Sequence, residues 1–96
     1  MHVVIRKFPT MQNIKEAARR SETGLGPLLK GQPGFKGYYI VALEGGGGGS
    51  ISLFDSAETA KAAHQQALSW VKENLADLSD GAQPEVTIGE VLAQVH

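Results

Sequence analysis

The fold is decided by residues 35–54, which read FKGYYIVALEGGGGGSISLF. Aromatic and β-branched residues dominate both ends of this stretch, as is typical of β-strands. We expect strands over 35–43 and 50–54, joined as an antiparallel hairpin by a flexible tip at 45–49. In the first strand, Tyr38 and Ile40 share one face, and the other face carries Phe35, Gly37, Tyr39, Val41 and Leu43. The glycine run lacks the lysine and the following helix of a phosphate-binding loop.

The residues before the hairpin predict one strand and one helix. Residues 2–8 are rich in β-branched side chains, and Pro9 ends the strand. Thr10 is the expected N-cap of a helix over 11–23. Gly24, Gly26 and Pro27 interrupt the helical pattern. We therefore expect a break at 24–27, with Pro27 opening a short helical piece that ends at residue 30.

The residues after the hairpin predict a long helix and a last strand. Asp55 and Glu58 have the spacing of a capping box. Apolar positions then recur every three or four residues, with one histidine among them: Ala57, Ala60, His64, Ala67, Val71, Leu75 and Leu78. Asp80 and Gly81 end this helix, and residues 86–95 are expected to form the last strand.

The order strand, helix, strand, strand, helix, strand predicts a single ferredoxin-like α+β domain over residues 1–96. In this βαββαβ plan a four-stranded antiparallel sheet carries two helices on one face. The second strand places large side chains on both faces, so the face without helices is expected to be apolar. An exposed apolar sheet face usually marks an interface, and we expect a homodimer formed through it.

Composition excludes several classes of function. The 96 residues carry a net charge of −1, without the basic excess of a nucleic-acid-binding protein. There is no cysteine, and His2, His64 and His96 lie far apart, so neither a disulfide nor a metal site is expected. No apolar stretch is long enough for a membrane span, and no cofactor motif is present. A cytoplasmic location is the default expectation.

Three segments carry a resemblance to a known superfamily. They are Gly-Phe-Lys-Gly-Tyr-Tyr at 34–39, Ser-Leu-Phe-Asp at 52–55, and Trp70 on the following helix. Together with the element order, they resemble the dimeric α/β-barrel superfamily and, within it, the antibiotic-biosynthesis-monooxygenase-like proteins. This resemblance implies a homodimeric barrel with a cleft between each sheet and its helices. Members include cofactor-free oxygenases, haem-degrading enzymes, isomerases and many small uncharacterised proteins.

The haem-degrading members use an asparagine, a tryptophan and a histidine that this chain does not match. Their asparagine lies on the first strand, which reads HVVIRKF here. The histidine of this chain, His64, also precedes Trp70 instead of following it.

His64 is the candidate catalytic residue, because an imidazole titrates near neutral pH and can shuttle a proton. The alternative is a partly buried histidine bonded to a backbone carbonyl or to water. Trp70 and Asn74, one helical turn apart, are candidate substrate contacts, and core or interface packing is the alternative for Trp70.

Three strand residues complete the candidate binding site. Tyr38 and Tyr39 lie on opposite faces, so one is expected in the cleft and the other at the dimer face. Either can also serve packing alone. Arg6 shares one face of the first strand with Val4 and Phe8, and we expect it to bind an anionic substrate or to pair with a carboxylate such as Glu90.

Three functions remain open at this point. The leading hypothesis is a small-molecule-binding protein of the antibiotic-biosynthesis-monooxygenase-like group. The first alternative is a cofactor-independent oxygenase or isomerase that acts on a small aromatic or polyketide-like molecule. The second is a structural or regulatory dimer without a ligand, whose cleft is filled by Leu25, Leu28, Leu29 and Trp70.

Overall fold

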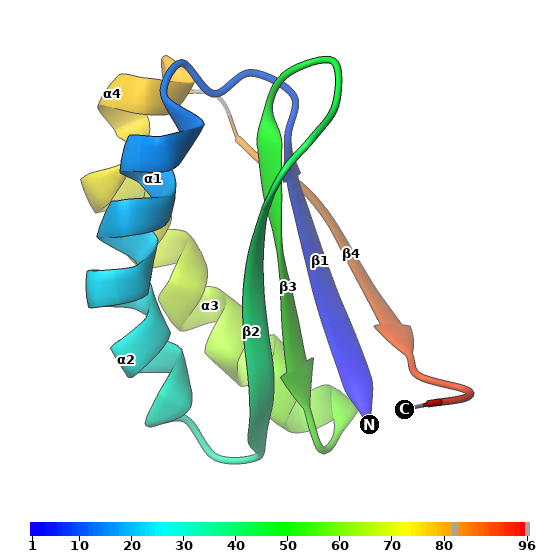
Figure 1. The fold of residues 1–96 in the computed structure, drawn as a ribbon. Helices are drawn as coiled ribbons and strands as arrows, with labels where there is room; N and C mark the ends of the chain where they lie inside the picture. The colour runs from blue at the N-terminus through cyan, green and yellow to red at the C-terminus, as the bar shows by residue number, and fades with distance from the viewer. Residues whose placement is uncertain (82, 96) are drawn as a thin grey trace.

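A computed structural model describes residues 1–81 and 83–95 and confirms the expected ferredoxin-like order (Figure 1). The elements are, in chain order, β1 (His2–Phe8), α1 (Ile14–Arg20), the π-helical turn η1 (Ser21–Leu25), α2 (Gly26–Lys30), β2 (Phe35–Ala42), β3 (Gly48–Phe54), α3 (Ala57–Asn74), α4 (Ala76–Ser79) and β4 (Glu85–Glu90). The four strands form one antiparallel sheet in the order β2-β3-β1-β4. His96 lies outside the described residues.

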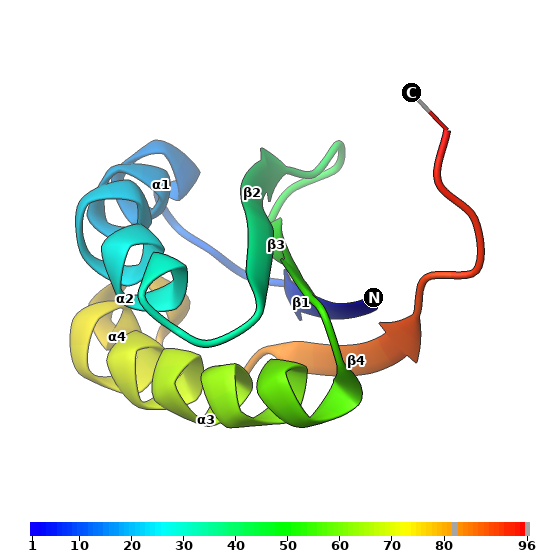
Figure 2. The same ribbon diagram turned by 90° about the horizontal axis from the view of Figure 1, so that it is seen from below.

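All helices cover the same face of the sheet, as Figure 2 shows from below. Alternation along β1 turns Val4, Arg6 and Phe8 toward the helices and leaves Ile5 and Lys7 on the open face. The apolar core lies between the helices and the sheet and contains Val4, Phe8, Met11, Ala17, Leu25, Leu29, Phe54, Ala60, Ala63, Ala67, Val71 and Leu75. Small alanines on α3 let this helix lie close to the strands.

The start of β2 differs from the alternation that the sequence predicts. Phe35 faces the core, where its ring meets Phe54 edge-on with centroids 6.0 Å apart. The register between β2 and β3 shifts between Phe35 and Gly37, so the strand gains one residue in a β-bulge. Phe35 therefore lies on the opposite face from Tyr39, although simple alternation predicted that the two residues share a face.

The expected helix break at 24–27 is also wrong, whereas the short helical piece that Pro27 opens and residue 30 ends is confirmed as α2. Residues 14–30 run as one continuous helical segment in which the turn η1 has π-helical bonding, so the Gly26 N–H donates to the Ser21 carbonyl. Pro27 falls in the first turn of α2, where its missing N–H removes no needed bond. The N-cap of α1 is Asn13, whose side chain accepts from the Glu16 N–H, and not Thr10.

The caps of α3 also differ from the expected ones. Ser56 is the N-cap, and it forms a reciprocal capping box with Thr59. Asp55 instead accepts a hydrogen bond from the Thr59 hydroxyl, at 2.8 Å. After α4, Asp80 and Gly81 both adopt positive φ, which ends the helical region where the sequence predicts it.

The last strand is shorter than expected. β4 pairs with β1 from Lys7 opposite Glu85 to His2 opposite Glu90. The Val91 N–H donates one further hydrogen bond to the Met1 carbonyl. Residues 91–95 then leave the sheet as an extended arm on the side away from the helices (Figure 2).

The glycine run is only partly a hairpin tip. Gly45, Gly46 and Gly47 form the turn with positive φ. Gly48 and Gly49 already belong to β3, and a side chain at Gly48 would collide with Ile14 of α1. The glycine at this position therefore lets the start of α1 rest directly on the sheet.

Candidate functional site

A buried arginine lies in the middle of the layer between sheet and helices. Arg6, on β1, is only 1% exposed. Its Nε donates to His64 Nδ1 at 3.2 Å, and its Nη1 donates to Ser52 Oγ at 3.0 Å. Its Nη2 is buried and has no hydrogen-bond partner in the structure. Among the described residues no carboxylate forms an ion pair with Arg6, and the β1–β4 register puts Glu90 opposite His2 instead.

Burial without a counter-ion disfavours the charged guanidinium. It lowers the pKa of Arg6 to about 10, although the neighbouring Tyr38 acts in the opposite direction. The side chain therefore still carries its positive charge at neutral pH. A buried cation of this kind is costly for folding, which makes it a candidate for binding an anion.

Serines on β3 make room for the arginine, and the sequence analysis missed them. Ser50 and Ser52 face the helices and are buried, whereas Ile51 and Leu53 face the opposite side. Strand parity was the available signal. The alternation that turns Phe54 inward also turns both serines inward, so the central strand carries polar side chains on its covered face.

His64 comes from α3 and meets the arginine from the helix layer. Because an arginine Nε–H is always a donor, His64 Nδ1 must be unprotonated and the proton of the neutral ring must lie on Nε2. Burial and, secondly, the charge of Arg6 lower the pKa of His64 below its ordinary value. The histidine is therefore neutral at pH 7, and its Nδ1 is already engaged.

Tyr38 lies on the covered face of β2, near Arg6. Burial raises the pKa of its phenol, while the Ser21 hydroxyl, the Arg6 charge and the Ser50 hydroxyl act in the opposite direction. The phenol thus keeps its proton at neutral pH and can donate a hydrogen bond. Ser21 reaches this place from the π-helical turn, which brings a buried hydroxyl toward the sheet.

Four of the polar side chains described above line a small cavity. It measures about 20 Å³ and is lined by Arg6, Tyr38, Ser21 and Ser50 together with Phe8, Met11, Ile14, Ala17, Leu25, Ile40, Gly49, Val71 and Leu75. That volume holds about one water molecule or one oxygen-bearing group of a ligand. The cleft between sheet and helices is thus nearly closed, and its few polar groups gather at one place among apolar walls.

Trp70 packs between α3 and the π-helical turn η1. It is partly buried against the core, and its indole covers Gly24 of the π-helical turn. A Cβ at Gly24 would lie 2.7 Å from the indole ring, so glycine is needed there. Trp70 does not line the small cavity, whereas Leu25 does, and Leu29 is completely buried nearby.

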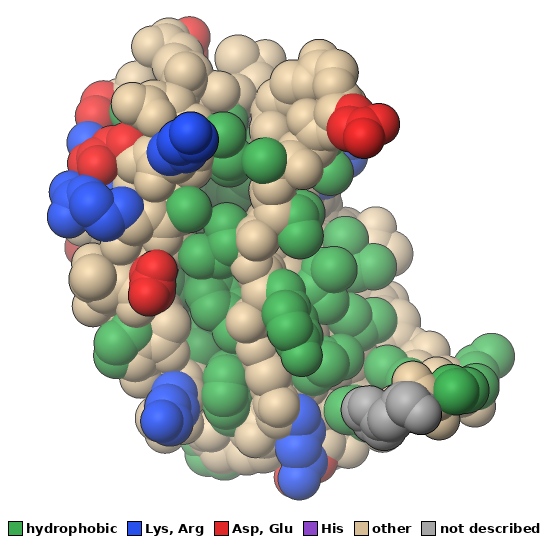
Figure 3. Space-filling model, viewed as in Figure 1, with side chains coloured by type: hydrophobic (Ala, Val, Ile, Leu, Met, Phe, Trp, Pro, Cys, Tyr) green, Lys and Arg blue, Asp and Glu red, His purple; other side chains and the backbone are tan. Residues whose placement is uncertain are grey.

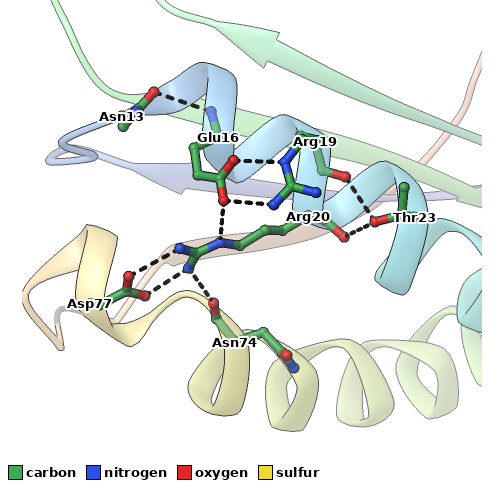
Figure 4. A network of polar contacts seen from close by, with 7 residues as sticks. All are labelled: Asn13, Glu16, Arg19, Arg20, Thr23, Asn74 and Asp77. Atoms are coloured by element: carbon green, nitrogen blue, oxygen red, sulfur yellow. Dashed lines mark hydrogen bonds and ion pairs between the residues drawn. The ribbon is translucent and has the colours of Figure 1, made fainter.

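Asn74 is exposed and belongs to a surface network that joins α1 to the end of α3 and to α4 (Figure 4). Its side chain donates to the Trp70 carbonyl, and its own carbonyl accepts from Arg20. Arg20 also pairs with Glu16 and Asp77, both at 2.8 Å. The structure thus brings Arg6, Tyr38 and His64 together and places Asn74 away from them.

Tyr39 lies on the open face of the sheet. It is 59% exposed and stands in a cross-strand row with Ile51 and Ile5, which is 44% exposed. Figure 3 shows hydrophobic side chains gathered over the strands, with the charged side chains mainly over the helices and at the ends of the sheet. Beneath the hairpin loop, this face is hollowed into a groove of about 550 Å³ lined by residues that include Val41 and Leu43.

Within residues 1–81 and 83–95, no group of three or more histidine or carboxylate side chains is arranged to hold a metal ion. None of the helices described here combines the length and the hydropathy needed to cross a membrane.

Sequence comparison found no match: no protein-family model fits this chain, and no curated protein does. Comparison of folds with solved structures, in contrast, gave several. The monooxygenase ActVA-Orf6 of Streptomyces coelicolor, solved with nanaomycin D, has a TM-score of 0.75 at 14% identity, over 99% of this chain and 90% of its own. SnoaB, a cofactor-independent oxygenase from Streptomyces nogalater, has a TM-score of 0.75 at 12% identity, over 98% and 95%.

A third solved structure is a variant of MhuD with two manganese protoporphyrin IX molecules bound per active site. Its TM-score is 0.74 at 15% identity, over 100% of this chain and 99% of that one. Identities this low establish the fold and nothing finer. The chain has the ferredoxin-like α+β fold of the antibiotic-biosynthesis-monooxygenase-like proteins.

Proposed function

We propose that this protein binds a small acidic organic molecule in the cleft between sheet and helices, with an oxyanion of the ligand at Arg6. One observation carries the proposal: the guanidinium is buried beside a cavity, has no carboxylate partner among the residues that the structure describes, and keeps one nitrogen unpaired. A carboxylate, a phenolate or an enolate would supply the missing acceptor and the missing negative charge. The protonated hydroxyl of Tyr38 is the second polar anchor.

The walls of the cavity indicate the rest of the ligand. Apart from the serines, Arg6 and Tyr38, they are aliphatic or aromatic. An apolar pocket with a few converging polar groups is the usual form of a small-molecule site. Because the cavity holds only one small group, the body of a ligand requires the helices to move away from the sheet. The fold neighbours with bound nanaomycin D or porphyrin are consistent with such a cleft holding large aromatic molecules.

Cofactor-independent oxygenation is the second candidate, and the likeness to SnoaB supports it. For an aromatic ketone with an acidic CH₂ group, loss of a proton gives an enolate that Arg6 would stabilise. Oxygen then accepts the electron pair to give a peroxide, and loss of water leaves a carbonyl, so that CH₂ plus O₂ becomes C=O plus H₂O. Tyr38 holds its proton at neutral pH and His64 Nδ1 is occupied, so neither offers a free base. We therefore rank binding above oxygenation.

We further propose that two copies associate through the open sheet face. The row of Tyr39, Ile51 and Ile5 exposes apolar surface that a second sheet would cover. The arm of residues 91–95 supports this, because it extends on the same side and its Leu92 is 87% exposed. The nearly closed cleft supports a third candidate, a regulatory dimer that binds no ligand.

Titration with benzoate tests the proposed ligand class, and benzamide serves as the uncharged control of the same shape. We expect benzoate to bind and benzamide to bind at least 10-fold more weakly. In Arg6→Met the affinity for benzoate should fall at least 10-fold, which is the effect of losing one charged hydrogen bond of about 1.5 kcal/mol. Lys61→Met, which removes an exposed charge on α3, should leave it unchanged.

Native mass spectrometry, followed by denaturing extraction, tests assembly and a natural ligand together. A dimer that carries an extra small mass supports both proposals. A dimer without an extra mass that also does not bind benzoate favours the regulatory dimer over a binding protein. A monomer at micromolar concentration contradicts the proposed interface.

A further inference from the structure

The contact between His64 and Arg6 indicates a role for this histidine other than proton transfer. In the folded chain, Nδ1 of His64 accepts the Arg6 Nε–H at 3.2 Å, and Ser52 accepts from Nη1 at 3.0 Å. These two bonds fix two of the three guanidinium nitrogens. The third, Nη2, is the nitrogen left for a ligand.

We infer that His64 is a positioning residue whose unprotonated Nδ1 holds Arg6 in place, so that protonation of His64 weakens the binding of an acidic ligand. This inference rests on the proposed function only for its last step, since the contact exists without a ligand. A protonated imidazole carries a hydrogen on both nitrogens and cannot accept from Nε. It would also add a second positive charge beside the first, so the pair must separate.

The elements around His64 carry few charged groups. The covered face of β1 contributes Arg6 and, farther along, His2, and the β1–β4 register puts Glu90 beside His2. β3 contributes the neutral Ser52, β2 contributes Tyr38, and α3 itself carries the exposed Lys61. The charged side chains of α2 and β4 are exposed: Lys30, Glu85 and Glu90. Within residues 1–81 and 83–95, only Arg6 is hydrogen-bonded to His64. Burial and this same cation lower the pKa of His64, which keeps the contact intact at neutral pH.

The sign of the pH dependence separates positioning from direct anion binding. If His64 itself bound the anion, acidification would strengthen binding because the imidazole would become a cation. If His64 positions Arg6, acidification weakens binding, since the guanidinium loses its support. A structural histidine with neither part would change stability with pH but not the affinity of the folded protein.

The first measurement is by NMR on the ligand-free protein, which reports the ring tautomer of His64 and solvent exchange at Arg6 Nε–H. We expect a proton on Nε2 and strong protection of the Arg6 Nε–H at neutral pH, measured against an exposed arginine at the same pH, with protection at least 10-fold lower once His64 is protonated. His64→Asn keeps an acceptor at the Nδ1 position but does not titrate, so protection should persist at all pH values. His64→Leu should show little protection throughout, and His2→Asn should match the wild type.

The second measurement is the benzoate affinity over the same pH range, in which the carboxylate stays ionised above about pH 5.5. We expect wild-type affinity to fall in proportion to the fraction of His64 that NMR shows still unprotonated, and that of His64→Asn to stay flat. If protection of the Arg6 Nε–H changes neither with pH nor in His64→Leu, the inference is overturned, regardless of the benzoate result. Absence of benzoate binding at every pH contradicts the proposed ligand class instead, and the exchange data then still decide the part played by His64.

Discussion

Replacing Arg6 with methionine should make the protein more stable while it removes ligand binding. A residue retained for folding would behave in the opposite way, since its loss would destabilise the protein. Methionine has a similar unbranched shape and no charge, and it adapts well to irregular cores. The perturbation therefore removes the buried cation and leaves most of the packing.

The magnitude follows from the surroundings of the guanidinium. A pKa of about 10 means that burial disfavours the charged form by roughly 3 kcal/mol relative to an exposed arginine. The two hydrogen bonds to His64 and Ser52 return part of that. Their loss leaves two acceptors that cost about 1 kcal/mol each, the lower end of the usual range, because the Ser52 hydroxyl can rotate and the His64 ring can change tautomer. We expect a net gain of about 1–2 kcal/mol, which agrees in sign with other buried charges replaced by apolar side chains.

Urea unfolding, followed by Trp70 fluorescence and circular dichroism at one fixed protein concentration, measures this difference. For a chain of this length the gain corresponds to a rise in Tm of roughly 5–15 °C. Lys61→Met is the matched control, because it removes an exposed lysine from α3, and it should stay within about 0.5 kcal/mol of the wild type. A loss of more than about 1 kcal/mol in Arg6→Met, with the control unchanged, would show that the arginine serves folding, and the reasoning would fail.

Three further predictions use other contacts. Gly24→Ala should destabilise by about 1–3 kcal/mol and shift the fluorescence of Trp70, because a Cβ there would lie 2.7 Å from the indole. Gly26→Ala, two residues on, meets nothing closer than 3.5 Å and should change stability by less than about 1 kcal/mol in the same urea assay. Tyr39→Glu should convert a dimer to a monomer in sedimentation velocity at micromolar concentration, since it puts a charge on the open apolar face. Tyr38→Phe should weaken benzoate binding about 5-fold by calorimetric titration without loss of stability beyond about 1 kcal/mol; unchanged affinity would remove this phenol from the site.

Local pattern was enough to predict the element order, because each signal lies within one element. The stripe of small and apolar residues on α3 and the turn at Asp80 are of this kind. One error lies where another element decides the outcome, because the bulge beside Phe35 is set by pairing with β3. Others are local, since more than one nearby residue could cap each helix: Asn13 caps α1 in place of Thr10, and Ser56 caps α3 in place of Asp55.

The candidate site divides in the same way. Alternation along the strands was enough to place Arg6 on one face of β1 and to separate Tyr38 from Tyr39. It could not predict that α3 would bring His64 to the arginine, since that depends on how the helix is rotated and translated over the sheet. Nor could it predict how little room remains, because the π-helical turn that lines the cavity has no recognised sequence signature here.

On two strands of the sheet, an apolar side chain lies on the open face while its polar neighbour is buried on the covered face. On β1, the apolar Ile5 is 44% exposed, whereas its neighbour Arg6 is 1% exposed. On β3, the polar Ser52 is completely buried, while Ile51 lies on the open face. A slip of one residue would bury the isoleucines and expose the arginine, but it would also turn Val4 and Phe8 out of the core, so the register holds and the isoleucines stay on the open face. This arrangement is favourable if a second sheet covers the isoleucines and an anion reaches the arginine. The same pair of strands thus supports both the dimer through the open face and the anion site at Arg6, and a separate experiment tests each proposal.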